Sequence, residues 1–154
     1  METPREILFK AKRKDNGEWV YGYPMPYRCG DDKGYEIVIN EMCYDKVFDR
    51  LHSYCAHIIE PTTLSQFTGK YDTSGKRIFE NDIVEIEQFN NYDNYYDFTT
   101  LVGYVHWCGG AFEVLGKETE DDEPYVWLHD CIQAGIQVIG NRFDNPELLE
   151  EENL

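Results

Sequence analysis

The stretch QFTGKYDTSGKRIFENDIV, residues 66–84, alternates turn-forming residues with apolar ones. Gly69 and Gly75 predict turns, the second within residues 72–76, and Asp82 is expected to accept hydrogen bonds from nearby backbone amides. Four apolar residues predict strand and core positions: Ile78, Phe79, Ile83 and Val84. This combination of turn formers and apolar anchors is typical of a motif that specifies a fold.

Five short strands are predicted from the end of this stretch onward, because apolar runs are separated by turns rich in glycine, asparagine and aspartate. They cover residues 83–89, 99–107, 111–115, 125–128 and 136–139. This content predicts a C-terminal SH3-like five-stranded β-barrel, closed or nearly closed, over residues 61–145. A five-stranded OB-type barrel has similar content. The SH3-like form is favoured because a long polar excursion follows the first strand and a tight Gly109-Gly110 hairpin follows the second.

Residues 1–60 are predicted to form a separate β-rich region, because near Glu60-Pro61 the sequence changes from mixed structure to short strands separated by Gly, Asn and Asp turns. Residues 5–24 alternate in polarity around Asp15-Asn16-Gly17, which is a strong hairpin signal. A turn at 31–34 and a strand at 35–39 follow. Apolar residues spaced i, i+3, i+4 and i+7 over 44–54 predict a short helix. The chain is therefore expected to be mainly β (α+β), with a β-hairpin-containing extension before the barrel.

Residues 146–154 predict a short helical turn and an acidic tail. Asn145 suits the N-cap and Pro146 the first helical position, while Glu147 is favourable to the helix dipole. Leu148 and Leu149 are expected to anchor this last turn.

The charge of the chain is strongly negative. Its 154 residues include 14 Lys and Arg against 30 Asp and Glu, for a formal charge of −16, and residues 113–154 alone hold 12 acids and 2 bases. Such a field repels phosphates, so direct nucleic-acid binding is not expected. An acidic mimic of nucleic acid that blocks a basic host protein stays open as an alternative. The sequence has no apolar run of membrane-spanning length and no apolar signal segment, which predicts a cytoplasmic protein that does not enter a membrane.

Five cysteines without a CxxC pair predict reduced thiols. Three Cys and His pairs are two residues apart: Cys55 with His57, His106 with Cys108, and His129 with Cys131. Residues i and i+2 share a face of a strand, so two such pairs on neighbouring strands would form a zinc site. Alternatively, the histidine of one pair would activate its cysteine as a nucleophile. Known zinc modules mostly use turn-based spacings, and Cys is also a common core residue. We therefore expect no cofactor and no catalytic residue, and keep a zinc-binding module or small hydrolase as an alternative.

An aromatic segment at residues 89–98 is the better functional candidate. It is predicted to be a polar, tyrosine-rich loop at 90–97, flanked by the two strands. Tyrosine contributes large contact area with little loss of entropy, so the segment suits recognition of a protein partner. Packing over an open end of the barrel is the alternative, and both interpretations stay open. The candidate partner-binding residues are Phe89, Tyr92, Tyr95, Tyr96 and Phe98.

The opening stretch closely resembles the central motif of the YopX family, small proteins of phages and prophage-like elements. Residues 5–11, 103–107 and 138–149 match in the same order, so the resemblance covers nearly the whole chain. The family pattern has glycine where this chain has Asn81, and both residues tolerate a positive φ, which predicts a left-handed position. The resemblance implies a small barrel-containing fold and offers no catalytic residues to transfer.

These observations together predict a non-enzymatic accessory protein of a phage or mobile element. It is expected to act as a protein-binding or self-assembly module, with an unidentified protein or another copy of itself as partner.

Overall fold

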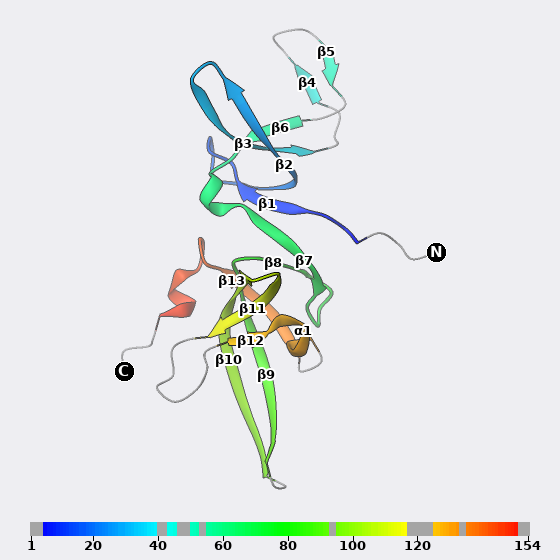
Figure 1. Cartoon of the computed structure of the whole chain (residues 1–154), viewed down its shortest axis with the longest axis vertical. Coiled ribbons are helices and arrows are strands. Elements are labelled where there is room, and N and C mark those ends of the chain that lie inside the picture. Colours follow the sequence, from blue (N-terminus) through cyan, green and yellow to red (C-terminus); the bar gives the residue numbers. More distant parts are fainter. Residues whose placement is uncertain are drawn as a thin grey trace. The chain divides into compact units, whose positions relative to one another are not determined.

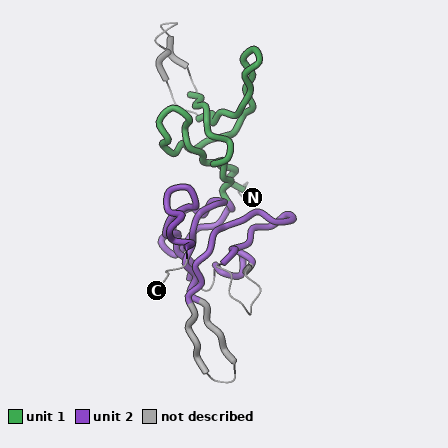
Figure 2. The backbone as a smooth tube through the Cα atoms, turned by 90° about the vertical axis from the view of Figure 1, so that its left-hand side faces the viewer, with its two compact units in different colours: residues 1–67 green, residues 68–154 purple. Residues whose placement is uncertain are grey.

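The computed structural model describes residues 5–39, 43–45, 50–52, 55–92, 95–116, 125–132 and 135–150. Most of these residues lie in antiparallel strands (Figure 1). The chain divides into two compact units, residues 1–67 and 68–154, which Figure 2 shows in different colours. The mainly β class is therefore confirmed, while the boundary expected near residues 60–61 stays a prediction.

Unit 1 contains an antiparallel sheet whose strands pair in the order β6-β3-β2-β1-β7. Strand β7 crosses into unit 2, where β8 (Arg77–Phe79) completes the order. The predicted hairpin is confirmed, since Phe9 pairs with Gly22 and Lys12 with Trp19 around a turn in which Gly17 has a φ of 73°. The strands are β1 (Phe9–Lys12), β2 (Trp19–Cys29), β3 (Asp32–Ile39), β6 (Cys55–Ile58) and β7 (Ser65–Tyr71).

The end of β6 returns to the end of β1. Arg13 forms a bridge with Ile59, and the amides of Lys14 and Glu60 donate to the carbonyls of Ile58 and Lys12, each at 2.9 Å. A short 3-10 helix, η1 (Pro61–Thr63), follows. The strands thus wrap a small core whose fully buried members are Ala11, Ile37 and Ile59, with Phe9, Val20, Ile39 and Leu64 packed against them.

Two prolines lie inside β2 without disrupting the sheet. Pro24 pairs with Ile37 and Pro26 with Tyr35, both beyond Gly22, the last residue of β2 that pairs with β1. Proline is tolerated there because the strand has a neighbour on one side only. The following turn is at Gly30 and Asp31, slightly earlier than the predicted 31–34, and the strand predicted at 35–39 lies within β3.

The helix predicted over residues 44–54 is wrong wherever the structure describes that segment. Strands β4 (Cys43–Asp45) and β5 (Arg50–His52) form a separate two-stranded sheet, with Tyr44 opposite Leu51. A spacing of i, i+3, i+4 and i+7 over a short run does not exclude strands, because two strands joined by a turn also bring such residues together. Residues 46–49, 53 and 54 lie outside the described part.

Unit 2 contains a five-stranded antiparallel sheet in the order β12-β11-β10-β9-β13. All five predicted strands are confirmed. They are β9 (Asp82–Tyr92), β10 (Tyr95–Cys108), β11 (Ala111–Gly116), β12 (Tyr125–Trp127) and β13 (Ile136–Asn141). In the described residues no ladder joins β12 to β13, so of the predicted closed or nearly closed barrel the closed form is not present there.

The polar loop predicted at residues 90–97 is wrong in its backbone conformation at residues 90–92 and 95–97; residues 93 and 94 lie outside the described part. Strand β9 extends to Tyr92 and β10 begins at Tyr95, and the two pair as a long hairpin in which Phe89 is opposite Phe98 and Tyr92 opposite Tyr95 (Figure 1). Residues rich in Asn and Asp resist strand formation intrinsically, but a paired partner strand supplies the backbone hydrogen bonds that outweigh that preference.

The core of unit 2 lies on one face of its sheet. Val105 pairs with Val114, Ile86 with Ile136, and Val84 with Val138, so these side chains share a face. The short helix α1 (Leu128–Cys131) packs Leu128 and Cys131 onto it. Gly103 lies in the middle, where an added Cβ would be 2.4 Å from the carbonyl oxygen of Leu115.

The opening motif folds largely as predicted. Asn81 has a φ of 66°, which confirms the left-handed position predicted from the glycine that the family pattern has there. An Asp82 carboxylate oxygen accepts a 2.9 Å hydrogen bond from the Phe79 amide, as expected. Gly75 lies in the expected turn. Gly69 does not: it lies inside β7, although its φ of 80° does require glycine-like freedom.

The C-terminal helical turn predicted at Pro146 is a 3-10 helix, η2 (Pro146–Leu149). Asn145 occupies the N-cap position without the predicted side-chain cap. Its Oδ1 atom instead lies 3.4 Å from the Asn141 amide, which donates to it. Leu148 and Leu149 are half-buried.

Candidate functional site

The five aromatic residues predicted to bind a partner lie on the long β9–β10 hairpin. The register places Phe89 opposite Phe98, Tyr92 opposite Tyr95, and Tyr96 opposite Asn91. Their side chains lie outside the described part of the structure, so interface and packing both remain open. The acidic segment at residues 118–123 also lies outside it.

The first two Cys and His pairs lie on strands, which is the arrangement that the zinc hypothesis required. Cys55 and His57 are half-buried on β6, and on β10 His106 is half-buried while Cys108 is exposed. The first pair belongs to unit 1 and the second to unit 2. Across the described ranges, no three His, Cys, Asp or Glu side chains come together in a way that could hold a metal ion.

The third pair is not on a strand, so it lacks the arrangement that the zinc hypothesis required. His129 and Cys131 lie on α1, and their side chains have opposite environments: His129 is exposed and lies 2.9 Å from Asp130, whereas Cys131 is buried. The Cys131 thiol donates to the carbonyl of Trp127 at 3.3 Å. Burial, with a smaller contribution from Asp130, raises the pKa of Cys131 to about 11. A protonated thiol in the core is neither a ready metal ligand nor a nucleophile.

An exposed apolar surface lies on the outer face of the sheet of unit 1. Alternate residues of β2 point away from the core, and Tyr21, Tyr23 and Met25 are 49%, 55% and 49% exposed. On β6, Ile58 is 46% exposed. We call these four side chains the outer apolar face. Scattered exposed apolar residues are ordinary, but several on one face of a sheet are typical of interaction sites.

The sheet register shows that this face is continuous. Tyr23 pairs with Val38, which pairs with Ala56, and Met25 pairs with Glu36, which pairs with Ile58. Directly opposed residues of antiparallel strands point to the same side and lie close enough to touch. Two rows therefore cross three strands, and they are apolar except for the half-buried Glu36.

Two lysines continue the face toward β1. Lys10 is opposite Tyr21 and Lys12 is opposite Trp19. Their Nζ atoms lie 4.9 and 5.6 Å from the centre of a Trp19 ring, within the range of a cation–π interaction. The aromatic row of β2 thus has cations beside one end.

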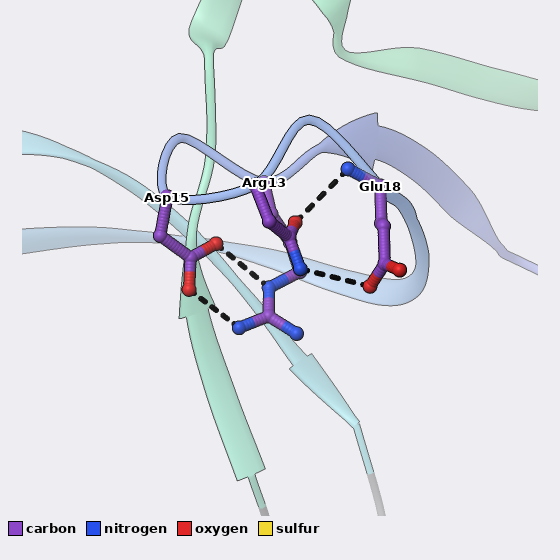
Figure 3. A network of polar contacts seen from close by, with 4 residues as sticks. Arg13, Asp15 and Glu18 are labelled. Atoms are coloured by element: carbon purple, nitrogen blue, oxygen red, sulfur yellow. Dashed lines mark hydrogen bonds and ion pairs between the residues drawn. The ribbon is translucent and has the colours of Figure 1, made fainter.

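A cavity of about 340 Å³ adjoins the other side of the face, at β6. Ala56 and Ile58 line it together with His57 and the turn residues Arg13, Lys14 and Asp15. The Arg13 guanidinium donates two hydrogen bonds to the Asp15 carboxylate, at 2.9 and 2.6 Å (Figure 3). The same hydrogen bonds hold the pKa of Asp15 below its usual range. Lys14 is exposed, and no carboxylate among the described residues pairs with it.

Sequence reasoning used the alternation of Trp19, Tyr21 and Tyr23 only as evidence of a hairpin and missed this face. The sequence did contain a signal for this face. A turn at residues 15–17 sets a hairpin register in which Tyr21 is opposite Lys10, on the other side of the sheet from Phe9 and Ala11. The aromatic residues therefore share the lysine side of the hairpin, and small or restricted residues, Gly22 and Pro24, occupy the core side.

The geometry defines a two-unit, antiparallel β protein with an exposed aromatic face on its first unit. The family model described as "YopX protein" matches residues 8–150, so the chain belongs to the YopX family. A solved structure, protein EF1440 from Enterococcus faecalis, is similar with a TM-score of 0.51 and 20% identity, covering 96% of this chain and 100% of that one. At this identity the likeness concerns the fold alone. A comparison with curated proteins finds no match.

Membrane insertion through a helix finds no support in the described part of the chain. None of its helices is both long enough and apolar enough to span a bilayer.

Proposed function

We propose that this protein is a non-enzymatic protein-binding or self-assembly module of a phage or mobile element, acting in the cytoplasm of the host cell. The observation that carries the proposal is the outer apolar face, where Tyr21, Tyr23, Met25 and Ile58 are each about half exposed. Burying such side chains against a partner is favourable by roughly 25 cal/mol per Å² of apolar surface, and tyrosine and methionine are enriched at interfaces.

The order of the five-stranded sheet supports an SH3-like arrangement of unit 2. Four strands follow one another as a meander, β9 to β12, and β13 returns beside β9. We propose that this unit is an SH3-like barrel left open in its described residues. The long β9–β10 hairpin, with Phe89, Tyr92, Tyr95, Tyr96 and Phe98, remains a proposed second contact region.

The experiment that tests the proposal compares partner capture by the wild type and by a Tyr21→Ser, Tyr23→Ser double variant. Immobilised protein is incubated with host lysate, and bound proteins are quantified by mass spectrometry. The control is Tyr35→Ser, because Tyr35 is 46% exposed but lies on the opposite face of β3 from Glu36 and Val38.

We expect the double variant, and not the control, to lose a partner or to change in self-association. Unchanged capture and unchanged mass in the folded double variant would remove the face from the proposal. A Tyr92→Ala, Tyr95→Ala, Tyr96→Ala variant then asks whether the hairpin carries the contact instead.

A specific observation keeps the acidic mimic as a second candidate. Residues 68–154 hold 5 Lys and Arg against 19 Asp and Glu, a net charge of −14. If this unit imitates nucleic acid, a basic host protein should be captured, and its release should rise steeply with salt concentration.

A further inference from the structure

The two units differ sharply in charge. Residues 1–67 hold 9 Lys and Arg and 11 Asp and Glu, for a net charge of −2, while residues 68–154 carry −14. The face with exposed aromatic residues belongs to the nearly neutral unit. The half-buried Lys12 and the buried Lys10 lie on its β1 side, and the exposed Lys14 lies at the cavity.

We infer that the outer apolar face and the adjoining cavity of unit 1 bind the acidic unit 2 of a second copy of this chain. The inference rests on the proposed function and names its partner. Tyr23, Met25 and Ile58 supply the apolar contact, and Lys14 at the cavity supplies the cation that meets a carboxylate of the other copy.

Charge complementarity selects this occupant. Lys14 is exposed and lines the cavity together with Ala56 and Ile58, which belong to the apolar rows. Arg13 is already paired with Asp15, so among the described residues Lys14 is the cation at the cavity that no carboxylate pairs with, next to apolar surface. Unit 2 offers both requirements of a matching surface, namely excess carboxylates and exposed large side chains such as Trp107 and Trp127, which are 46% and 38% exposed.

The same face is a poor platform for single-stranded nucleic acid. Glu36 lies within it, between Met25 and Ile58, where it would repel a backbone with one negative charge per nucleotide. A protein partner, by contrast, can place a hydrogen-bond donor or a cation against Glu36 and still place its carboxylates elsewhere, beside Lys14. Unit 2 contains an exposed cation that could meet Glu36, for example Lys76.

The contact is heterologous, since one copy uses unit 1 and the other uses unit 2. Each copy then keeps a second surface free, so association continues beyond a dimer unless the rotation closes a ring. Because the contact depends on only a few side chains, Tyr23, Met25, Ile58 and Lys14, we expect reversible association in the micromolar range.

Sedimentation velocity of the full chain tests the inference, with protein from about 1 to about 200 µM. We expect the weight-average mass to rise with concentration. The Tyr23→Ser, Met25→Ser variant should weaken association at least about tenfold, and Tyr35→Ser should leave it unchanged. A wild type that remains monomeric throughout this range overturns the inference.

Charge reversal gives a second, gentler variant in case the double serine variant does not fold. Lys14→Glu should weaken association by about three- to tenfold. Lys33→Glu is the matched control, because it changes net charge equally and is exposed on β3 at a position that alternates with the face. If Lys14→Glu and Lys33→Glu weaken association equally, only the net charge matters, and the proposed contact at Lys14 is overturned.

Zero-length carbodiimide cross-linking identifies the surfaces. In an equimolar mixture of unlabelled and ¹⁵N-labelled chains, intermolecular cross-links carry both isotope forms. We expect mixed cross-links from Lys14 to carboxylates within residues 68–154. Mixed cross-links confined to residues 1–67, or binding of an oligo-dT probe through the face, overturn the inference. Capture of a host protein by a monomeric chain overturns it too but preserves the proposed function.

Discussion

The Oδ2 atom of Asp72 accepts a 3.1 Å hydrogen bond from the backbone amide of Val138, 66 positions away in the sequence. The Oδ1 atom accepts from the Ser74 hydroxyl and from the amides of Ser74 and Lys76, at 2.6 to 2.9 Å. One buried carboxylate therefore shapes its own turn and also joins that turn to β13.

Replacing Asp72 by alanine should lower the free energy of unfolding by about 2–4 kcal/mol, because four part-buried hydrogen bonds lose their charged acceptor. Chemical denaturation followed by circular dichroism measures the change. Asp130→Ala is the control, since Asp130 is exposed and its contact with His129 is expected to contribute little. Similar losses in both variants would contradict the anchoring role of Asp72.

The contribution of Asp72 should disappear in acid. Burial alone would raise the pKa of Asp72, but hydrogen bonds from Ser74, Val138 and Lys76 outweigh it and lower the pKa below its usual value. The folded state therefore favours the ionised form, so the stabilisation is present above the unfolded pKa of about 3.9 and is lost as pH falls through the folded pKa. The stability difference between wild type and Asp72→Asn should shrink over that window in denaturation curves. A difference independent of pH would exclude this linkage.

Asn81 should tolerate glycine and reject a β-branched residue. Its φ of 66° costs roughly 1–2 kcal/mol for an ordinary L-residue. We expect Asn81→Gly to stay within about 0.5 kcal/mol of wild type and Asn81→Val to lose 1–2 kcal/mol or more in thermal unfolding. Equal stability of the two variants would mean that the turn relaxes to a negative φ.

Gly103→Ala should be more damaging than an alanine in an open turn. The added Cβ would lie 2.4 Å from the Leu115 carbonyl oxygen, so the β10–β11 pairing must shift, at an expected cost of about 2–3 kcal/mol. Gly30→Ala is the control: its Cβ meets nothing within 4 Å, and its positive φ alone costs about 1 kcal/mol. Differential scanning calorimetry compares them, and a smaller loss at Gly103 would refute the steric argument.

Cys131 should resist thiol reagents while the protein is folded. With its pKa raised to about 11 by burial and by Asp130, almost no thiolate exists at pH 8. We expect Cys131 to react at least about 100-fold more slowly than exposed Cys29 and Cys108, as followed by mass spectrometry of alkylated peptides. Comparable rates would show that α1 opens readily.

Local patterns predicted much of the fold. The Asn16-Gly17 turn placed the first hairpin, and period-2 alternation located the five strands of unit 2. The turn chemistry at Asp72, Asn81 and Asp82 was also predictable, since it depends on side chains within a few residues of each other.

Errors arose where partner strands outweighed local preference. The Asn- and Tyr-rich residues 90–97 were predicted to be a loop, yet each strand of the β9–β10 hairpin supplies the other with backbone partners. Residues 44–54 were predicted to be helical, yet Tyr44 lies opposite Leu51 in a strand pair. Neither pairing is visible from composition or from a single period.

The sequence by itself determined the β class, the turns at Gly17 and Gly75, the YopX resemblance and the concentration of acid in the C-terminal part, because these depend on residue type and short-range spacing. Only the tertiary structure decided that Tyr21, Tyr23 and Met25 share an exposed face with Ile58, 33 positions further along than Met25. The physical reason is register: a shift of one residue between strands would turn every side chain to the other side of the sheet, and long-range pairing sets that register.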